Sequence, residues 1–395
     1  MILNNNKIKK DPSQEKIKFI LDLLNSNKLK NAKREAHELI VKYPNSSVLF
    51  NILGAVLVGQ NEFNKGIENY KKAIQINPNY AQAYNNLGVA LHKLNKKNEA
   101  INNYKKAISL KTDFAEAYNN LGSVTQDINK PLEAQRYLEK ALQFKSNYAE
   151  AYNNLGRVYE NLGKKTEALE HFQKAININP DYAEAYNNIG LALFDMTRFD
   201  ESILSYKKAI NLKPNYEKPY NNLGNVLSCF GKYNEAENLY HQAIKIKPDN
   251  ASAYSNLLFN YNYKTEWDSN SYLLKAKKYR LNCKSIKKKL SFQYQYEKNP
   301  KKIKLGFVSA DFGNHPGGYF TLSTLRELKN KNFDLIAYVT NERNDATSHH
   351  FKPLFLKWNI ISRKNDEEIV EQIIKDGVHI LIDAQGHSSK NRLSI

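Results

Sequence analysis

A hexapeptide, Ala-Tyr-Asn-Asn-Leu-Gly, recurs along much of this chain at a fixed spacing. It occupies 83–88, 117–122 and 151–156, and close variants occupy 185–190 and 219–224. The glycines of the series lie 34 residues apart, at Gly54, Gly88, Gly122, Gly156, Gly190 and Gly224. A fixed period of this length indicates a stack of repeated units, each of which buries its apolar face against its neighbours.

Each unit has the pattern of two helices. Tyr84, Leu87 and Leu91 follow one another at helical spacing, so they share one face with Gly88. The second half of the unit carries small residues, such as Ala100 and Ala107, which let two helices approach closely. Prolines that stop the second helix close many units, at Pro44, Pro78, Pro180, Pro214 and Pro248.

This pattern resembles the tetratricopeptide repeat, which has the same period. The resemblance predicts seven repeats over 13–250, the first of them atypical because Ile20 stands in the place of the glycine. Residues 1–12 are polar, and we expect them to be disordered. Residues 251–301 are interpreted as a capping helix followed by a basic connector.

Positive charge is concentrated in that connector. The chain has a formal net charge of +19, and residues 264–302 hold twelve Lys or Arg against three acidic residues. The basic run at 284–289 has two interpretations. It is either part of a solvated connector, or it contacts phosphate or an anionic membrane. Because no nucleic-acid recognition module is recognisable, we expect no nucleic-acid partner.

The sequence gives no sign of a membrane span, a signal peptide or a metal site. No apolar run approaches the roughly 20 residues that a spanning helix requires, and the first residues lack the apolar core of a signal peptide. Cys229 and Cys283 have neither metal-ligand spacing nor a disulfide framework. We therefore expect a cytoplasmic protein that needs no metal and no cofactor.

Residues 302–395 have a different pattern, in which strands alternate with helices. Apolar strand-like runs lie at 303–312, 333–340, 358–361 and 378–386, and segments of helical spacing lie at 321–330, 348–356 and 366–377. This alternation predicts a parallel, doubly wound sheet, whose ligands bind beyond the carboxyl ends of the strands. The loops at those ends are 310–320 and 383–395. Spacing alone favours a simple chain-reversing turn for Gly313, Gly317 and Gly318.

Two motifs in this region resemble the O-GlcNAc transferases of glycosyltransferase family 41, most closely the bacterial members. They are SADFGNHPGGYF (309–320) and DGVHILIDAQGHSSKNRL (376–393). The family also places tetratricopeptide repeats before this region. The predicted fold is therefore mainly α, a tetratricopeptide-repeat superhelix followed by an incomplete α/β Rossmann-like (GT-B-type) half-domain at 302–395. We expect the chain to stop inside the first of the family's two catalytic halves, and a UDP-sugar to bind only where the second half is present.

The resemblance implies a reaction and a set of site residues. The reaction is the transfer of N-acetylglucosamine from UDP-GlcNAc to a Ser or Thr hydroxyl of an acceptor protein. His315 falls on the family's active-site histidine, and the residues that would shape the acceptor loop are Asp311, Asn314, Pro316 and His387. The alternative is a catalytically inactive scaffold in which the repeats only recruit partner proteins.

The second asparagine of each hexapeptide is the candidate for binding polypeptide. In the family these residues form a ladder along the inner surface, and here they are Asn86, Asn120, Asn154, Asn188, Asn222 and Asn256, with Ile52 breaking the series. An amide both donates and accepts hydrogen bonds, so it can hold a peptide backbone whatever its sequence. The competing interpretation is that these amides bond between repeats or cap helices.

Overall fold

The computed structural model describes residues 11–261, 263, 300–314, 316–331, 333–341, 345–362 and 364–384. The basic run at 284–289, nearly all of the expected connector and residues 1–10 of the expected tail lie outside this part. The chain divides into two units, Met1–Lys213 and Pro214–Ile395. Among the described residues, no helix is long and apolar enough to cross a membrane.

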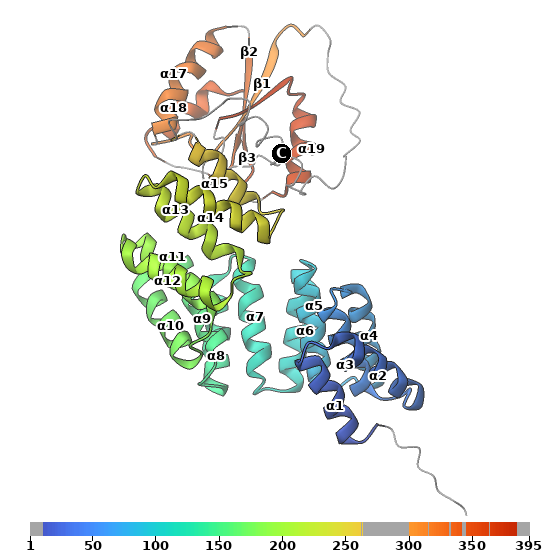
Figure 1. Ribbon diagram of the computed structural model, residues 1–395. Coiled ribbons are helices and arrows are strands. Elements are labelled where there is room, and N and C mark those ends of the chain that lie inside the picture. Colours follow the sequence, from blue (N-terminus) through green and yellow to red (C-terminus); the bar gives the residue numbers. More distant parts are fainter. Residues whose placement is uncertain are drawn as a thin grey trace, which may run out of the picture. The chain divides into compact units, whose positions relative to one another are not determined.

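The first unit consists of stacked helices, each packed on the next along the chain (Figure 1). The helices are α1 (Gln14–Asn25), α2 (Leu29–Lys42), α3 (Ser47–Gly59), α4 (Phe63–Ile76), α5 (Ala81–Lys93), α6 (Lys97–Leu110), α7 (Ala115–Asp127), α8 (Pro131–Phe144), α9 (Ala149–Asn161), α10 (Lys165–Ile178), α11 (Ala183–Asp195) and α12 (Phe199–Leu212). The second unit begins with three more, α13 (Glu217–Cys229), α14 (Tyr233–Ile246) and α15 (Ala251–Tyr261). The predicted helical repeat architecture is confirmed.

The repeated glycine lets the two helices of a unit come together. A Cβ added at Gly88 would lie 2.6 Å from the ring of Tyr104, and one at Gly190 would lie 2.6 Å from the ring of Tyr206. Both tyrosines are almost fully buried. The aromatic ring of the second helix therefore fills the space that any other residue at the glycine position would occupy.

A second periodic feature is a left-handed residue in the turn between the two helices of each unit. The residues with positive φ in these turns are Asn27, Asn61, Asn95, Asn129, Gly163, Thr197 and Gly231, again 34 residues apart. Asparagine and glycine tolerate this conformation, whereas a β-branched residue is strained in it. Thr197, with φ of 60°, is the exception in the series.

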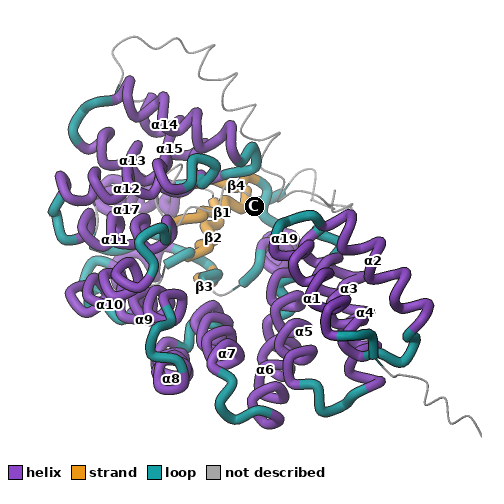
Figure 2. Tube along the Cα trace, turned by 60° about the horizontal axis from the view of Figure 1, so that its bottom comes forward, coloured by secondary structure: helices purple, strands orange, loops and turns teal. Residues whose placement is uncertain are grey.

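The rest of the second unit is a parallel sheet with helices on both faces. The strands β1 (Ile303–Ser309), β2 (Phe333–Val339), β3 (Lys357–Ile360) and β4 (Ile380–Asp383) lie in the order β3-β2-β1-β4 (Figure 2). One apolar cluster joins the sheet to α17 (Pro316–Asn330), α18 (Ser348–Phe351) and the short 3-10 helix η1 (Lys352–Leu354). A second cluster joins the opposite face to α19 (Asp366–Asp376). The predicted doubly wound α/β region is confirmed.

The first helix of this region begins earlier than the sequence pattern suggests. We expected it at 321–330, but α17 already starts at Pro316, whose fixed φ suits the first turn of a helix. Gly317 and Gly318 therefore lie in a helix and not in a chain-reversing turn. A Cβ at Gly318 would lie 2.6 Å from the carbonyl oxygen of Asp311, so the glycine allows a close contact with the preceding loop.

Candidate functional site

The paired asparagines of the hexapeptide form a hydrogen-bonded row from repeat to repeat. The first asparagine of each pair is buried and the second is half-buried. The second donates its Nδ2 hydrogen to Oδ1 of the first asparagine in the preceding repeat. These bonds are Asn86–Asn51 (3.0 Å), Asn120–Asn85 (3.0 Å), Asn154–Asn119 (2.9 Å), Asn188–Asn153 (2.9 Å) and Asn256–Asn221 (3.0 Å).

Tyrosines of the following repeat contact two of these first asparagines, and of the two Tyr80 is half-buried and Tyr148 is buried. Asn51 donates to the hydroxyl of Tyr80 at 3.4 Å, and Tyr148 is hydrogen-bonded to Asn119. Burial raises the pKa of Tyr148 above its usual value, and the nearby Glu116 carboxylate raises it further. The phenol therefore stays neutral, so the network keeps its hydrogen bonds over the physiological pH range.

The half-buried amides keep hydrogen-bonding capacity. Each amide has two hydrogens and an oxygen with two lone pairs, and the bond to the preceding repeat takes one hydrogen. Asn86 Oδ1 also accepts from Gln82 Nε2 at 3.0 Å, which still leaves one lone pair. The structure thus contains the inter-repeat bonds of the competing interpretation, while peptide binding by the same residues stays a prediction. Asn222, the remaining member of the predicted row, lies half-buried on α13.

Charged groups continue the same spacing toward the carboxyl ends of these helices. His92 Nε2 lies 2.8 Å from Asp127 Oδ2, and the two residues are 35 positions apart, like the asparagine partners. Glu160 and Asp195, two repeats further along, have the same offset. Burial, together with the Asp195 carboxylate, raises the pKa of Glu160 to about 7, although Arg157 and Lys165 act in the opposite direction.

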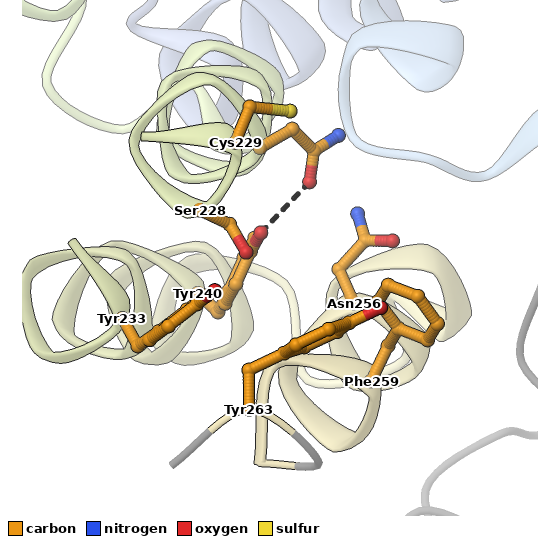
Figure 3. A pocket seen from close by; sticks show the side chains of 8 residues that line it. Ser228, Cys229, Tyr233, Tyr240, Asn256, Phe259 and Tyr263 are labelled. Atoms are coloured by element: carbon orange, nitrogen blue, oxygen red, sulfur yellow. Dashed lines mark hydrogen bonds between the residues drawn. The ribbon is translucent and has the colours of Figure 1, made fainter. Parts of the chain in front are cut away.

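A pocket of about 420 Å³ lies among α13, α14 and α15 (Figure 3). Its walls are Asn225, Ser228, Cys229, Tyr233, Tyr240, Asn256, Phe259 and Tyr263. The sequence analysis did not identify this pocket. The available signal was Ser228, because the residues at the equivalent position of earlier repeats are larger: Val58, His92, Gln126, Glu160 and Phe194.

The loop that follows β1 holds the described part of the predicted acceptor site. The backbone N–H of Asn314 donates to Asp345 Oδ2 at 3.0 Å, and Tyr319 Oη donates to Asn314 Oδ1 at 2.7 Å. Asp311 is half-buried next to Ser309, whose hydroxyl accepts from the Asp311 backbone N–H at 3.0 Å. The loop after β1 is thus tied to the loop after β2 at the carboxyl ends of the strands.

The structure describes only some of the remaining predicted residues of this site. Pro316 is the first residue of α17, whereas His315 and His387 lie outside the described residues, so their roles stay predictions. Asp345, which the sequence analysis did not select, accepts a second bond from the Ser348 backbone N–H at 2.7 Å. Within the described residues, no cluster of three or more His, Cys, Asp or Glu side chains is placed to hold a metal ion.

Family models match both parts of the chain. Tetratricopeptide-repeat models match residues 54–95, 90–128, 114–145, 149–182 and 181–249, and the model of glycosyl transferase family 41 matches residues 275–395. The repeats suggest protein binding. These matches agree with the resemblance drawn from the hexapeptide and from the two motifs of the α/β region.

Curated relatives resemble a limited part of the chain. A probable UDP-N-acetylglucosamine--peptide N-acetylglucosaminyltransferase SPINDLY from Oryza sativa subsp. japonica is 29% identical over 113 residues, which are 27% of this chain and 12% of the relative. The UDP-N-acetylglucosamine--peptide N-acetylglucosaminyltransferase of Caenorhabditis elegans is 27% identical over 100 residues, 25% of this chain and 9% of the relative. The matched segments therefore span about a tenth of each relative.

Solved structures share the fold. The Cut9–Hcn1 heterotetramer of the APC/C aligns with a TM-score of 0.57 and 19% identity, covering 61% of this chain and 48% of that chain. A mutant O-GlcNAc transferase from Thermobaculum terrenum aligns with a TM-score of 0.51 and 22% identity, covering 62% of this chain and 47% of that chain.

Proposed function

We propose, from the premise that this chain belongs to the O-GlcNAc-transferase-like glycosyltransferases with tetratricopeptide repeats, that its asparagine row binds extended acceptor polypeptide. The observation that carries the proposal is the fixed orientation of the half-buried amides. Five of the six, Asn86, Asn120, Asn154, Asn188 and Asn256, are held by a bond of 2.9–3.0 Å to the preceding repeat. Ordering these side chains on binding then costs little entropy, which favours recognition by many weak contacts.

The chemistry of the row suits a peptide backbone. A backbone offers one N–H and one C=O per residue, and an amide side chain can pair with either. Such contacts do not depend on the side chains of the ligand. The acceptor polypeptide would therefore be chosen by its extended conformation in the row, and by further contacts elsewhere.

For the transfer step, the acceptor hydroxyl attacks the anomeric carbon of UDP-GlcNAc and the bond from that carbon to the diphosphate breaks. The hydroxyl proton must pass to a base, and the resemblance assigns this place to His315. An imidazole has an ordinary pKa near neutrality, so it can accept a proton at physiological pH. The ordered loop around Asp311 and Asn314, at the carboxyl end of β1, supports a site at this edge of the sheet.

Binding can be tested with two matched pairs of substitutions. Asn120→Ala with Asn154→Ala removes two half-buried amides, whereas Asn85→Ala with Asn119→Ala removes the buried acceptors of the same two hydrogen bonds. The probe is a fluorescent extended peptide library of Gly, Ala, Ser and Asn, followed by anisotropy. We expect the first pair to weaken binding about thirtyfold, since each of the two lost hydrogen bonds is worth roughly 1 kcal/mol.

The second pair controls for stability, because both pairs break the same structural bonds. Far-ultraviolet circular dichroism checks that both variants keep their helices. Equal loss of binding in the two pairs would make the asparagines purely structural. Unchanged binding in the first pair would contradict the proposed role of the row.

Transfer is tested separately with radiolabelled UDP-GlcNAc and the same peptides, supplemented with Ser and Thr acceptors. Label on the peptide that disappears in His315→Ala supports the enzyme. The second candidate function is a scaffold that only recruits proteins. The asparagine row favours it, because the row lies within the repeats alone. Peptide binding without transfer is the result expected for it.

A further inference from the structure

The pocket among α13, α14 and α15 differs from the equivalent place in the preceding repeat. There Phe194 occupies the position of Ser228, and its ring lies 5.7 Å from that of Phe199, edge to face. Tyr233 is the equivalent of Phe199, 34 residues further along. The small Ser228 side chain leaves open the space that an aromatic ring takes in the repeat before it.

Aromatic rings form one side of this pocket. The rings of Tyr233 and Tyr263 are stacked with centroids 5.5 Å apart, and Phe259 meets Tyr263 edge to face at 5.3 Å. Phe259 is 43% exposed and Tyr263 is 51% exposed, so both present ring surface to an incoming group. Aromatic rings prefer aromatic neighbours at centroid distances of roughly 4.5–7 Å.

Two amides in the wall of the pocket offer a donor and an acceptor. Asn225 Oδ1 accepts from the Tyr240 hydroxyl at 2.9 Å (Figure 3), which turns its Nδ2 hydrogens to other partners. Asn256 donates through Nδ2 to Asn221 at 3.0 Å, which directs its Oδ1 to other partners. All eight residues that line the pocket are uncharged, so a charged side chain would lose its hydration there without an ionic partner.

We propose that this pocket binds a tyrosine side chain of the extended polypeptide. A phenol combines an aromatic ring with a hydroxyl that both donates and accepts, and it is neutral. Phenylalanine lacks the hydroxyl, and the indole of tryptophan only donates. The inference rests on the proposed function, because Asn256 is both a wall of the pocket and a member of the asparagine row.

The test uses a peptide library in which one central position is varied among all twenty amino acids. The flanking positions contain only Gly, Ala, Ser and Asn, so the central residue is the only aromatic or charged one. Affinity for the full chain is measured by competition with a fluorescent member. We expect tyrosine at the centre to bind about tenfold more tightly than alanine and about threefold more tightly than phenylalanine, since the ring and the hydroxyl contribute about threefold each.

Two variants of the pocket make the test specific. Ser228→Phe fills the cavity with the residue found in the preceding repeat, and Phe259→Ala removes a wall without removing a side-chain hydrogen bond. Both should abolish the preference for tyrosine while alanine-centred peptides bind as before. Ser109→Phe, at an exposed serine of α6, controls for the added ring. Circular dichroism checks folding, and Phe259→Ala remains informative if Ser228→Phe does not fold.

A footprint locates the bound side chain directly. Cys229 is exposed and lines the pocket, and Cys283→Ser leaves it as the only thiol of the chain. Tyrosine-centred peptides should slow the alkylation of Cys229 by iodoacetamide more than alanine-centred peptides at equal occupancy. A flat profile at the central position, or a tyrosine preference that survives both pocket variants, would overturn the inference and leave the asparagine row intact. Absence of any peptide binding would overturn both proposals.

Discussion

Glu160 provides a quantitative test of the packing between repeats. Its Oε1 atom is buried and has no hydrogen-bond partner within the described part of the chain. Burial and the Asp195 carboxylate raise the pKa of Glu160 from its ordinary value of 4.5 to about 7. Since one pKa unit corresponds to about 1.4 kcal/mol, the ionised carboxylate destabilises the folded state by up to roughly 3 kcal/mol.

The direction of the pH dependence follows from the raised pKa. Between pH 4.5 and about 7, the folded protein keeps a proton that the unfolded chain has released. Stability therefore falls as the pH rises through this window, and the full penalty is present above it. Glu160→Gln removes the charge, and glutamine already occupies the equivalent position of the preceding repeat as Gln126.

We expect Glu160→Gln to stabilise the protein by about 1–3 kcal/mol at pH 8 and to lose most of this gain at pH 5. Urea unfolding followed by circular dichroism gives the free energies, and hydrogen exchange in α9 locates the effect, because repeat proteins open locally. Glu170→Gln, at an exposed position of α10, controls for the loss of one negative charge. Equal effects at the two pH values, or destabilisation at pH 8, would refute the reasoning.

Three further substitutions test other parts of the fold. Thr197→Asn should raise the free energy of unfolding by roughly 1 kcal/mol, because asparagine tolerates the left-handed conformation of this turn; an unchanged or lower free energy of unfolding would contradict this. Ala175→Leu, at a fully buried contact, should cost roughly 1–3 kcal/mol and start proteolysis near α10; uniform resistance along the array would count against it. Asp376→Asn should weaken the protection of α19 in hydrogen exchange, because the buried carboxylate accepts from Tyr338 (2.9 Å) and Lys357 (2.6 Å). Burial raises the pKa of Asp376, but the hydrogen bonds from Lys357 and Tyr338 outweigh burial and lower the pKa below its ordinary value. The protection that the wild type has over the variant should therefore disappear at acid pH.

The sequence carries most of the fold because the fold is periodic. Residues that recur every 34 positions with helical spacing inside each unit, such as Gly88 and Leu91, define both the helices and the faces they bury. In the α/β region, apolar runs such as that at 333–340 place the strands to within a few residues. The start of α17 was missed because two glycines after Pro316 resemble a loop, and only the close approach of the loop at Asp311 explains Gly318.

The functional details depend on contacts that no local pattern contains. The amide bonds link residues 35 positions apart, such as Asn154 and Asn119, so the spacing of the hexapeptide suggests a row but not which asparagine is buried. The left-handed turn residues also recur with the period, yet Thr197 has no local signal for positive φ. The pocket appears only when Ser228 is compared with Phe194, because its volume depends on packing across three helices.

The half-buried asparagines bond to the preceding repeat and are proposed to bind polypeptide, and these two roles limit the residues that can replace them. At position 154, an aspartate would turn a carboxylate oxygen toward Asn119 Oδ1, which already serves as an acceptor at 2.9 Å. A serine is too short to span the same gap, and a glutamine would carry its amide beyond it. Only an asparagine donates to the preceding repeat and still presents an amide hydrogen and a carbonyl oxygen to a ligand. The same side chain that fixes one repeat on the next is therefore the one we propose to hold the polypeptide, and substitutions at the row should affect stacking and binding together unless the buried acceptor is changed instead.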